Sequence, residues 1–198
     1  MTEPDARRAL RRAMRARREA LSPPLRLAAA DGLARQLRML DAYATARRVA
    51  GYWAVRGELP LHALLAPAPR FDYCLPLLSE DMRLRFAPWR FGEPLQTNRH
   101  GIPEPDVAPA DTLAPDALDI VLVPLLAFDR HGHRLGSGAG YYDRSFAFLA
   151  TQARPARPLL VGVGYGFQQV ERLPAQPWDV PLDYVATDAE LIRCAPPA

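Results

Sequence analysis

Lysine is absent from this sequence, since all 25 of its basic residues are arginine. The absence excludes chemistry that depends on a lysine: the Walker-type phosphate loop, the pyridoxal phosphate Schiff base and the lysine-based aldolases. Arginine keeps its proton near neutral pH. The basic side chains can therefore clamp anions, but they cannot serve as general bases.

Cysteine is also scarce. Cys74 and Cys194 lie far apart, and neither belongs to a CxxC motif or stands near a histidine pair, so neither a zinc site nor a disulfide framework is predicted. No run approaches the roughly 18 consecutive apolar residues of a membrane span. Pro23 and Pro24 interrupt the sequence after the arginine-rich start, where a secretory signal would need an apolar region. We therefore expect a cytoplasmic protein without a membrane partner.

The length of 198 residues favours a single domain, residues 1–198, and the apolar half of the composition is enough for a real core. The net charge is only +3, so we do not expect a dedicated nucleic-acid partner. An arginine-rich helix at residues 5–21 is expected to pack as part of this domain. We also expect a monomer.

Apolar periodicity predicts an alternation of helices and strands. The predicted helices are residues 5–21, about 24–40, 61–65 and 142–151. The predicted strands are residues 48–55, 71–77, 84–88, 120–124, 159–163 and about 183–187. Residues 92–117 are rich in Pro, Asn, Asp and Gly and are expected to form a long irregular connection. The pattern predicts an α/β fold with a mostly parallel central sheet flanked by helices.

The most informative segment is a glycine-rich turn after the apolar run 120–124. Gly136, Gly138 and Gly140 alternate with other residues just before a predicted helix. Such a turn lets backbone N–H groups form an anion nest, and Arg134 and Arg144 on either side can hold phosphate oxygens. A tight strand-to-helix turn without a ligand is the simpler alternative. The segment predicts a phosphate-binding loop after a central strand.

Residues 128–144, FDRHGHRLGSGAGYYDR, resemble the signature FDxxGxRLGxGxGYYD of 5-formyltetrahydrofolate cyclo-ligases, also called 5,10-methenyltetrahydrofolate synthetases. Every fixed position of the signature is met, although Ala139 stands where the family often has glycine. Further similarity spans nearly the whole chain. It is carried by residues 7–11, with Arg7 in place of a lysine, and by residues 53–58, 101–105, 162–168, 173–174, 178–183 and 187.

The resemblance implies ATP-dependent cyclisation of 5-formyltetrahydrofolate to 5,10-methenyltetrahydrofolate, with release of ADP and phosphate, through a phosphorylated formyl intermediate. It implies ATP as co-substrate and Mg²⁺ as cofactor. Arg134 and Tyr142 are the implied catalytic residues. The implied ATP-binding residues are Arg7, Arg8, Ala9, Leu10, Arg11, Arg134, Leu135, Gly136, Ser137, Gly138, Ala139, Gly140, Tyr141 and Tyr142. For most arginines of the first helix, a solvated basic face is the favoured interpretation.

By the same resemblance, Asp143 and Asp179 hold Mg²⁺, and Trp53, Glu58 and His100 bind the folate. Each has an alternative: Asp143 as a helix cap or the partner of Arg144, Asp179 as a turn cap, Trp53 as a core residue, Glu58 as a surface residue and His100 as a loop histidine without a role.

Three other functions remain open at this point. The basic helix could bind a nucleic-acid backbone, although stacking aromatics do not alternate with its arginines. A sugar-phosphate isomerase or CoA-transferase relative could place a glycine-rich turn in the same position. A homologue without activity would carry the same motifs. Arg134, Asp143 and Asp179 together favour ATP with Mg²⁺ over a plain sugar phosphate.

Overall fold

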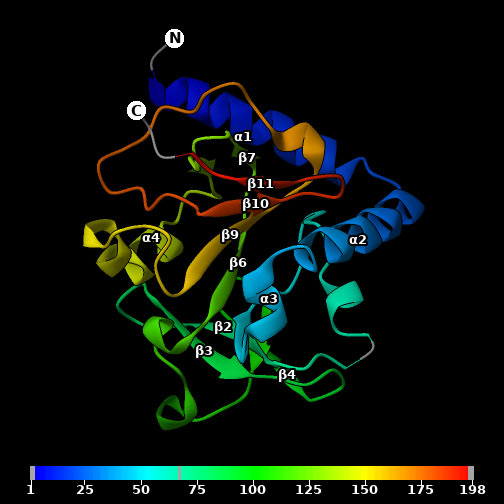
Figure 1. The fold of residues 1–198 in the computed structure, drawn as a ribbon, viewed down its shortest axis with the longest axis vertical. Coiled ribbons are helices and arrows are strands. Elements are labelled where there is room, and N and C mark those ends of the chain that lie inside the picture. Colours follow the sequence, from blue (N-terminus) through cyan, green and yellow to red (C-terminus); the bar gives the residue numbers. More distant parts are fainter. Residues whose placement is uncertain (1–2, 67, 196–198) are drawn as a thin grey trace.

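The computed structural model describes residues 3–66 and 68–195, which are built around a seven-stranded sheet (Figure 1). In spatial order its strands are β11 (Leu191–Arg193), β10 (Tyr184–Ala186), β9 (Leu159–Val163), β6 (Ile120–Pro124), β1 (Arg48–Ala50), β2 (Asp72–Leu78) and β3 (Leu84–Pro88). The strands from β10 to β2 run parallel, and β11 and β3 pair antiparallel at the two edges. The predicted α/β class with a mostly parallel sheet is confirmed.

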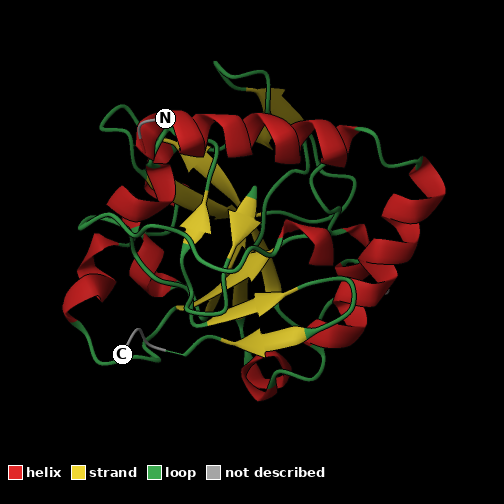
Figure 2. Ribbon diagram, turned by 90° about the horizontal axis from the view of Figure 1, so that it is seen from above, coloured by secondary structure: helices red, strands yellow, loops and turns green. Residues whose placement is uncertain are grey.

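Alternate residues of the central strands enter two separate cores. In β6, Ile120 belongs to the core on one face and Val121 to the core on the other. The first face is covered by α2 (Pro23–Leu37) and α3 (Asp41–Thr45), and the second by α4 (Tyr141–Ser145) with the 3₁₀ turn that follows it (Figure 2). Burial on both faces explains why the β6 sequence is apolar throughout rather than alternating.

Helix α1 (Glu3–Glu19) lies over a short hairpin made by β7 (Ala127–Phe128) and β8 (Arg134–Leu135). Leu10 and Met14 pack against this hairpin, and a guanidinium N–H of Arg18 reaches the carbonyl of Leu125 just beyond the end of β6. The helix is thus placed at the carboxyl end of the parallel strands, where open α/β sheets bind ligands.

Several predicted boundaries are wrong. The strand predicted at 48–55 ends at Ala50, and the chain then turns through Arg56 and Gly57, which have φ values of 50° and 72°. The helix predicted at 142–151 is interrupted at Phe146 and continues as a 3₁₀ turn. The connection at 92–117 contains a hairpin of β4 (Leu95–Thr97) and β5 (Pro103–Pro105), and β11 was not predicted. The glycine-rich loop follows β8 rather than the central strand directly.

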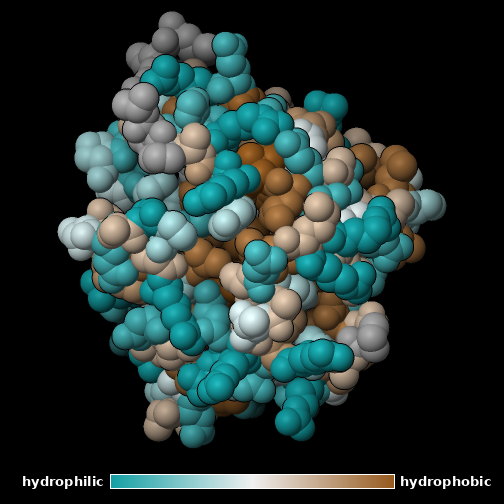
Figure 3. Space-filling model, viewed as in Figure 1, coloured by the Kyte–Doolittle hydropathy of each residue, from teal (hydrophilic) through white to brown (hydrophobic). Residues whose placement is uncertain are grey.

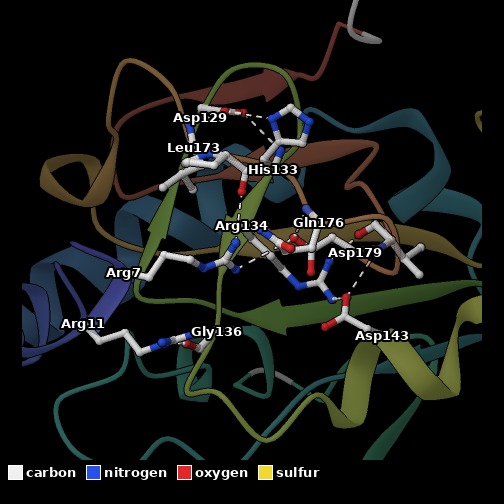
Figure 4. Close-up of polar contacts among 12 residues, drawn as sticks. Arg7, Arg11, Asp129, His133, Arg134, Gly136, Asp143, Leu173, Gln176 and Asp179 are labelled. Carbon is white, nitrogen blue, oxygen red and sulfur yellow. Dashed lines mark hydrogen bonds and ion pairs between the residues drawn. The ribbon is translucent and has the colours of Figure 1, made fainter. Parts of the chain in front are cut away.

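The turn between β7 and β8 is organised by the buried carboxylate of Asp129. Its Oδ1 accepts hydrogen bonds from the backbone N–H groups of His131 and His133, at 2.9 and 3.0 Å. Its Oδ2 accepts from the His133 ring Nδ1 and from the Leu173 backbone N–H, both at 2.9 Å (Figure 4). The Asp129 side chain therefore connects the β7–β8 hairpin, which leads into the glycine-rich loop, to the C-terminal segment that contains Leu173.

Asp129→Ala is expected to lower the free energy of unfolding by about 3 kcal/mol, because it leaves one buried donor and three partly buried donors without an acceptor, and a buried donor left unpaired costs about 1–3 kcal/mol. Urea denaturation of the variant measures the loss. Asp31→Ala, at an exposed position of α2, is the control and should stay within about 0.5 kcal/mol of the parent. A small loss in Asp129→Ala would mean that the turn does not depend on this carboxylate.

Figure 3 shows hydrophilic side chains over most of one face, with apolar side chains gathered in a smaller area near its centre. No described helix is long and apolar enough to cross a membrane.

Candidate active site

A cavity of about 660 Å³ opens at the carboxyl end of the parallel strands. It is bounded by the inner side of α1, the segments that follow β1 and β6, the tip of the β4–β5 hairpin and the glycine-rich loop. The predicted site residues that line it are Arg7, Arg11, Trp53, Glu58, His100, Arg134, Gly136, Ser137, Gly138, Ala139, Gly140, Tyr141, Tyr142, Asp143 and Asp179. Residues from five distant parts of the sequence thus share one cavity.

Four residues expected to bind ATP do not line this cavity, and we remove them from the site. Arg8 is exposed and pairs with Asp5, because one residue along a helix turns the side chain by about 100° from Arg7. Ala9 is not part of the lining. Leu10 and Leu135 pack together in the small core beneath α1.

The glycine-rich loop is shaped by two residues in conformations that favour glycine: Gly138 has φ +111° and Gly140 has φ +73°. A hydrogen bond from Arg11 Nε to the Gly136 carbonyl, at 3.0 Å, ties the loop to α1. Within the described residues, the backbone N–H groups of residues 136–140 donate no hydrogen bond. Such a row of free donors beside an arginine suits a phosphate group.

Arg134 is nearly buried and connects this loop to the C-terminal segment. Its guanidinium donates hydrogen bonds to the Val180 carbonyl and to Asp143 Oδ1, which also accepts from the Val180 backbone N–H at 3.2 Å (Figure 4). The predicted alternative partner of Asp143 was Arg144. That pairing is wrong, because Arg144 turns away from the cavity and donates to the carbonyls of Met82 and Ala139.

Asp179 lies beside this pair. Its Oδ2 accepts from the Gln176 backbone N–H at 3.0 Å and faces an Arg7 nitrogen at 3.8 Å, while another Arg7 nitrogen donates to the Pro174 carbonyl. Asp179 therefore caps its turn, as the alternative interpretation expected, and still faces the cavity.

The two carboxylates have the donor chemistry that Mg²⁺ prefers. The contacts of Asp143 fall on Oδ1 and those of Asp179 on Oδ2, which leaves one oxygen of each without a described hydrogen bond. No cluster of three or more His, Cys, Asp or Glu that could form a metal cage occurs in the described part of the chain. Mg²⁺ is commonly bound by one or two carboxylates together with substrate phosphates. The residues present fit such a site.

The other end of the cavity is built around Glu58. Its Oε2 accepts from the Val55 backbone N–H at 3.1 Å, and its Oε1 lies 3.7 Å from a guanidinium nitrogen of Arg18. Burial raises the pKa of Glu58, and the Val55 N–H, Arg18, Arg56 and Arg15 oppose that shift. The carboxylate is thus a partly dehydrated acceptor held in one orientation.

Aromatic groups surround this end. Trp53 is 38% exposed and packs edge-on against Trp89, so the structure places it at the cavity rather than in the core. His100 Nε2 lies 3.2 Å from the Tyr141 hydroxyl, which brings the β4–β5 hairpin against the glycine-rich loop. Burial, followed by the charge of Glu58, raises the pKa of Tyr142. Tyr142 is therefore a phenol at neutral pH that can donate a hydrogen bond.

Arg15 and Arg18 also line the cavity, although we expected a solvated basic face for most arginines of this helix. Arg18 is only 3% exposed and donates to the carbonyls of Leu125 and Arg56. The sequence carried a signal for this inward face, because residues 7, 11, 15 and 18 follow the helical period. The inward direction of these arginines favours a small anionic ligand over a nucleic-acid backbone.

Charge distinguishes this cavity from a second hollow of about 810 Å³. The first is lined by six arginines and three carboxylates, the excess of positive charge that a polyphosphate needs. The second is lined by Arg83 and Arg85 against Glu80, Asp81 and Asp116, and it contains none of the predicted site residues. We therefore assign the candidate site to the first cavity.

Comparison with known proteins identifies relatives of this chain. A 5-formyltetrahydrofolate cyclo-ligase of Escherichia coli K12 is 34% identical over 183 residues, which cover 90% of this chain and 98% of that protein. The enzyme of the same name from Haemophilus influenzae is 35% identical over 144 residues, covering 69% of this chain and 73% of that protein.

Two solved structures share the fold. The 5,10-methenyltetrahydrofolate synthetase of Aquifex aeolicus superposes with a TM-score of 0.80 at 30% identity, over 97% of this chain and 94% of that one. The synthetase of Mycoplasma pneumoniae gives 0.67 at 25% identity, over 92% and 98%. The profile of the 5-formyltetrahydrofolate cyclo-ligase family matches residues 3–188. The family profile, the sequence relatives and the shared fold agree: the chain belongs to the 5-formyltetrahydrofolate cyclo-ligase family.

Proposed function

We propose that this protein uses ATP to cyclise 5-formyltetrahydrofolate to 5,10-methenyltetrahydrofolate, acting as one domain over residues 1–198. The single observation that carries the proposal is the chemical difference between the two ends of the cavity. One end joins Arg7, Arg11 and Arg134 to a glycine-rich loop with free N–H groups, and the other joins a buried carboxylate to an exposed tryptophan. A triphosphate suits the first end, and a reduced pterin with N–H donors and a ring face suits the second. The cytoplasmic location and the monomeric state remain predictions.

The proposed reaction has two steps. The formyl oxygen on N5 attacks the γ-phosphorus of ATP, and the bond to the β,γ-bridging oxygen breaks so that ADP leaves with the electron pair. N10 then attacks the activated carbon and gives up its proton, and the carbon–oxygen bond breaks. Phosphate leaves with that oxygen and the proton, and the methenyl bridge remains. Neither step needs a protein nucleophile, which agrees with a chain that has no lysine.

The residues of the site serve positioning and charge. Arg134 and the loop 136–140 bind phosphate oxygens, Tyr142 donates a hydrogen bond near the reacting groups, and Glu58 accepts hydrogen bonds from the pterin edge. Asp143 and Asp179 hold Mg²⁺, which neutralises charge on the phosphates when bound. The β4–β5 hairpin, joined to the loop through His100 and Tyr141, excludes water from the activated carbon.

The direct test is an assay with purified protein, 5-formyltetrahydrofolate, ATP and Mg²⁺, in which the near-ultraviolet absorbance of the methenyl product is followed. We expect product only when both ATP and Mg²⁺ are present, with ADP and phosphate formed in equal amounts. A folded preparation that makes no product would refute the proposal. Product without ATP would refute the phosphoryl-transfer route.

Arg18→Met is expected to move the acid limb of the kcat/KM profile for the folate to higher pH. The limb reports protonation of Glu58, and loss of a neighbouring cation raises the pKa of a carboxyl group. The other ionisable groups near this carboxylate, Arg15, Arg56 and the tyrosines 52, 142 and 165, are unchanged by the substitution.

Arg18→Lys is the matched control, since it keeps the cation and should leave the limb near its original position. Thermal unfolding of both variants separates this effect from a loss of folded protein. A folded Arg18→Met enzyme with an unmoved acid limb would show that Arg18 does not control Glu58.

A further inference from the structure

Arg15 is a cavity residue without a partner. Its side chain lines the cavity between those of Arg11 and Arg18, and it makes no hydrogen bond or ion pair with residues 3–66 or 68–195. Its Nε is buried and lacks an acceptor. By contrast, Arg7, Arg11 and Arg18 are each fixed by backbone carbonyls. A half-buried guanidinium with unused donors is costly in an empty site and points to an anionic ligand.

Helix α1 runs along the cavity and places its inward-facing arginines at regular intervals. Its rise of about 1.5 Å per residue sets Arg7 and Arg18 about 16 Å apart, with Arg15 about 6 Å beyond Arg11 and about 4.5 Å before Arg18. Arg7 and Arg11 stand at the end with Asp179 and the glycine-rich loop, and Arg18 stands at the end with Glu58. Arg15 therefore lies between the end of the cavity that contains the glycine-rich loop and the end that contains Glu58.

Electrostatics supports this placement. After burial, the charges of Arg7 and Arg15 lower the pKa of Arg11, and the Arg15 charge is among the causes that lower the pKa of Arg18. Like charges crowd this side of the helix, and among the described carboxylates Glu58 is attracted by the Arg15 charge without forming an ion pair with it. A ligand that brings negative charge to the middle of the cavity would relieve the crowding.

We propose that Arg15 contacts the phosphoryl group during its transfer from ATP to the formyl oxygen. This inference rests on the proposed function and adds a catalytic residue to it. In that step the bond between the γ-phosphorus and the formyl oxygen forms while the bond to the bridging oxygen breaks. The equatorial oxygens of the phosphoryl group carry the charge, and the guanidinium stabilises them without exchanging a proton. The same contact holds the phosphate that leaves when N10 closes the ring.

Arg15→Gln tests the role, because it keeps the length and polarity and removes the charge. We expect kcat to fall about 100-fold or more, with KM for ATP and for the folate within about threefold of the parent. Equilibrium binding of ADP and of 5-formyltetrahydrofolate, measured separately by calorimetry, should also stay within about threefold. Arg15→Lys should recover part of kcat. Arg12→Gln, on the exposed side of the same helix, should behave like the parent.

The outcomes separate this inference from the proposed function. If the parent protein forms no product, the function itself fails. If the parent is active and Arg15→Gln is equally active, Arg15 does not touch the reacting group. If the variant loses only folate affinity, Arg15 binds a carboxylate of the substrate, and the inference is equally overturned. Only a selective loss of kcat supports it.

Discussion

Asp143→Asn lowers kcat about 100-fold and raises the Mg²⁺ concentration needed for half-maximal rate: this is the result we expect if Mg²⁺ binds at this end of the cavity as proposed. The substitution is nearly isosteric. The amide oxygen can still accept from Arg134 and from the Val180 backbone N–H, so the loop geometry is retained. What is lost is the negative charge, and with it the second oxygen that a hard cation prefers.

Steady-state rates over a range of Mg²⁺ concentrations measure both effects. Asp179→Asn should give a change of the same kind, because its carboxylate faces the same space. Asp31→Asn, on the exposed side of α2, is the matched control and should change neither kcat nor the Mg²⁺ dependence. A second readout is thermal stabilisation by ADP with Mg²⁺, which should be smaller in Asp143→Asn. If that stabilisation and the Mg²⁺ dependence were both unchanged, the metal assignment would be wrong while the family assignment stood.

Features encoded in one continuous segment were predictable from the sequence. The glycine-rich loop, Arg134 and Asp143 lie within ten residues of one another. The apolar run 120–124 predicts a buried strand by composition alone. The match to a long contiguous signature then indicated the chemistry. Helix boundaries were less predictable, because Phe146, at which α4 ends, is fully buried against Phe86 of β3, and that distant partner is not visible in the local sequence.

Features that depend on distant partners were not predictable in this way. Arg18 and Glu58 form an ion pair although they are 40 positions apart in the sequence. The sequence did not distinguish Arg18 from the other arginines of the basic helix. Gly57 shows why the two meet: its φ is +72°, and a Cβ there would lie 2.8 Å from the Arg18 carbonyl oxygen. The turn can therefore approach the end of α1 only with glycine at this position, which brings Glu58 to the buried guanidinium.

The second large effect is expected at the other end of the cavity. Glu58→Gln should lower kcat/KM for the folate about 100-fold, equal to about 2.7 kcal/mol of transition-state binding, and leave KM for ATP nearly unchanged. A carboxylate accepts hydrogen bonds from several donors, whereas an amide places its own N–H₂ against one of them. Glu171→Gln, at an exposed position without described contacts, is the control. Equal losses for ATP and folate would mean that Glu58 supports the whole site rather than one substrate.

The same variant should also change how stability depends on pH. Burial raises the pKa of Glu58 in the folded protein, so folding favours its protonated form. The stability contributed by such a group is present below its ordinary value of 4.5 and is lost as the pH rises through the raised value. Glutamine does not titrate, so between these values the variant should lose less stability with rising pH than the parent. Urea denaturation of both proteins from acid to neutral pH measures the difference, and parallel curves would contradict it. A loss of folate affinity together with a flatter pH dependence would mean that the fold holds this carboxylate in its charged form, at a cost in stability near neutral pH, because substrate binding requires the charge.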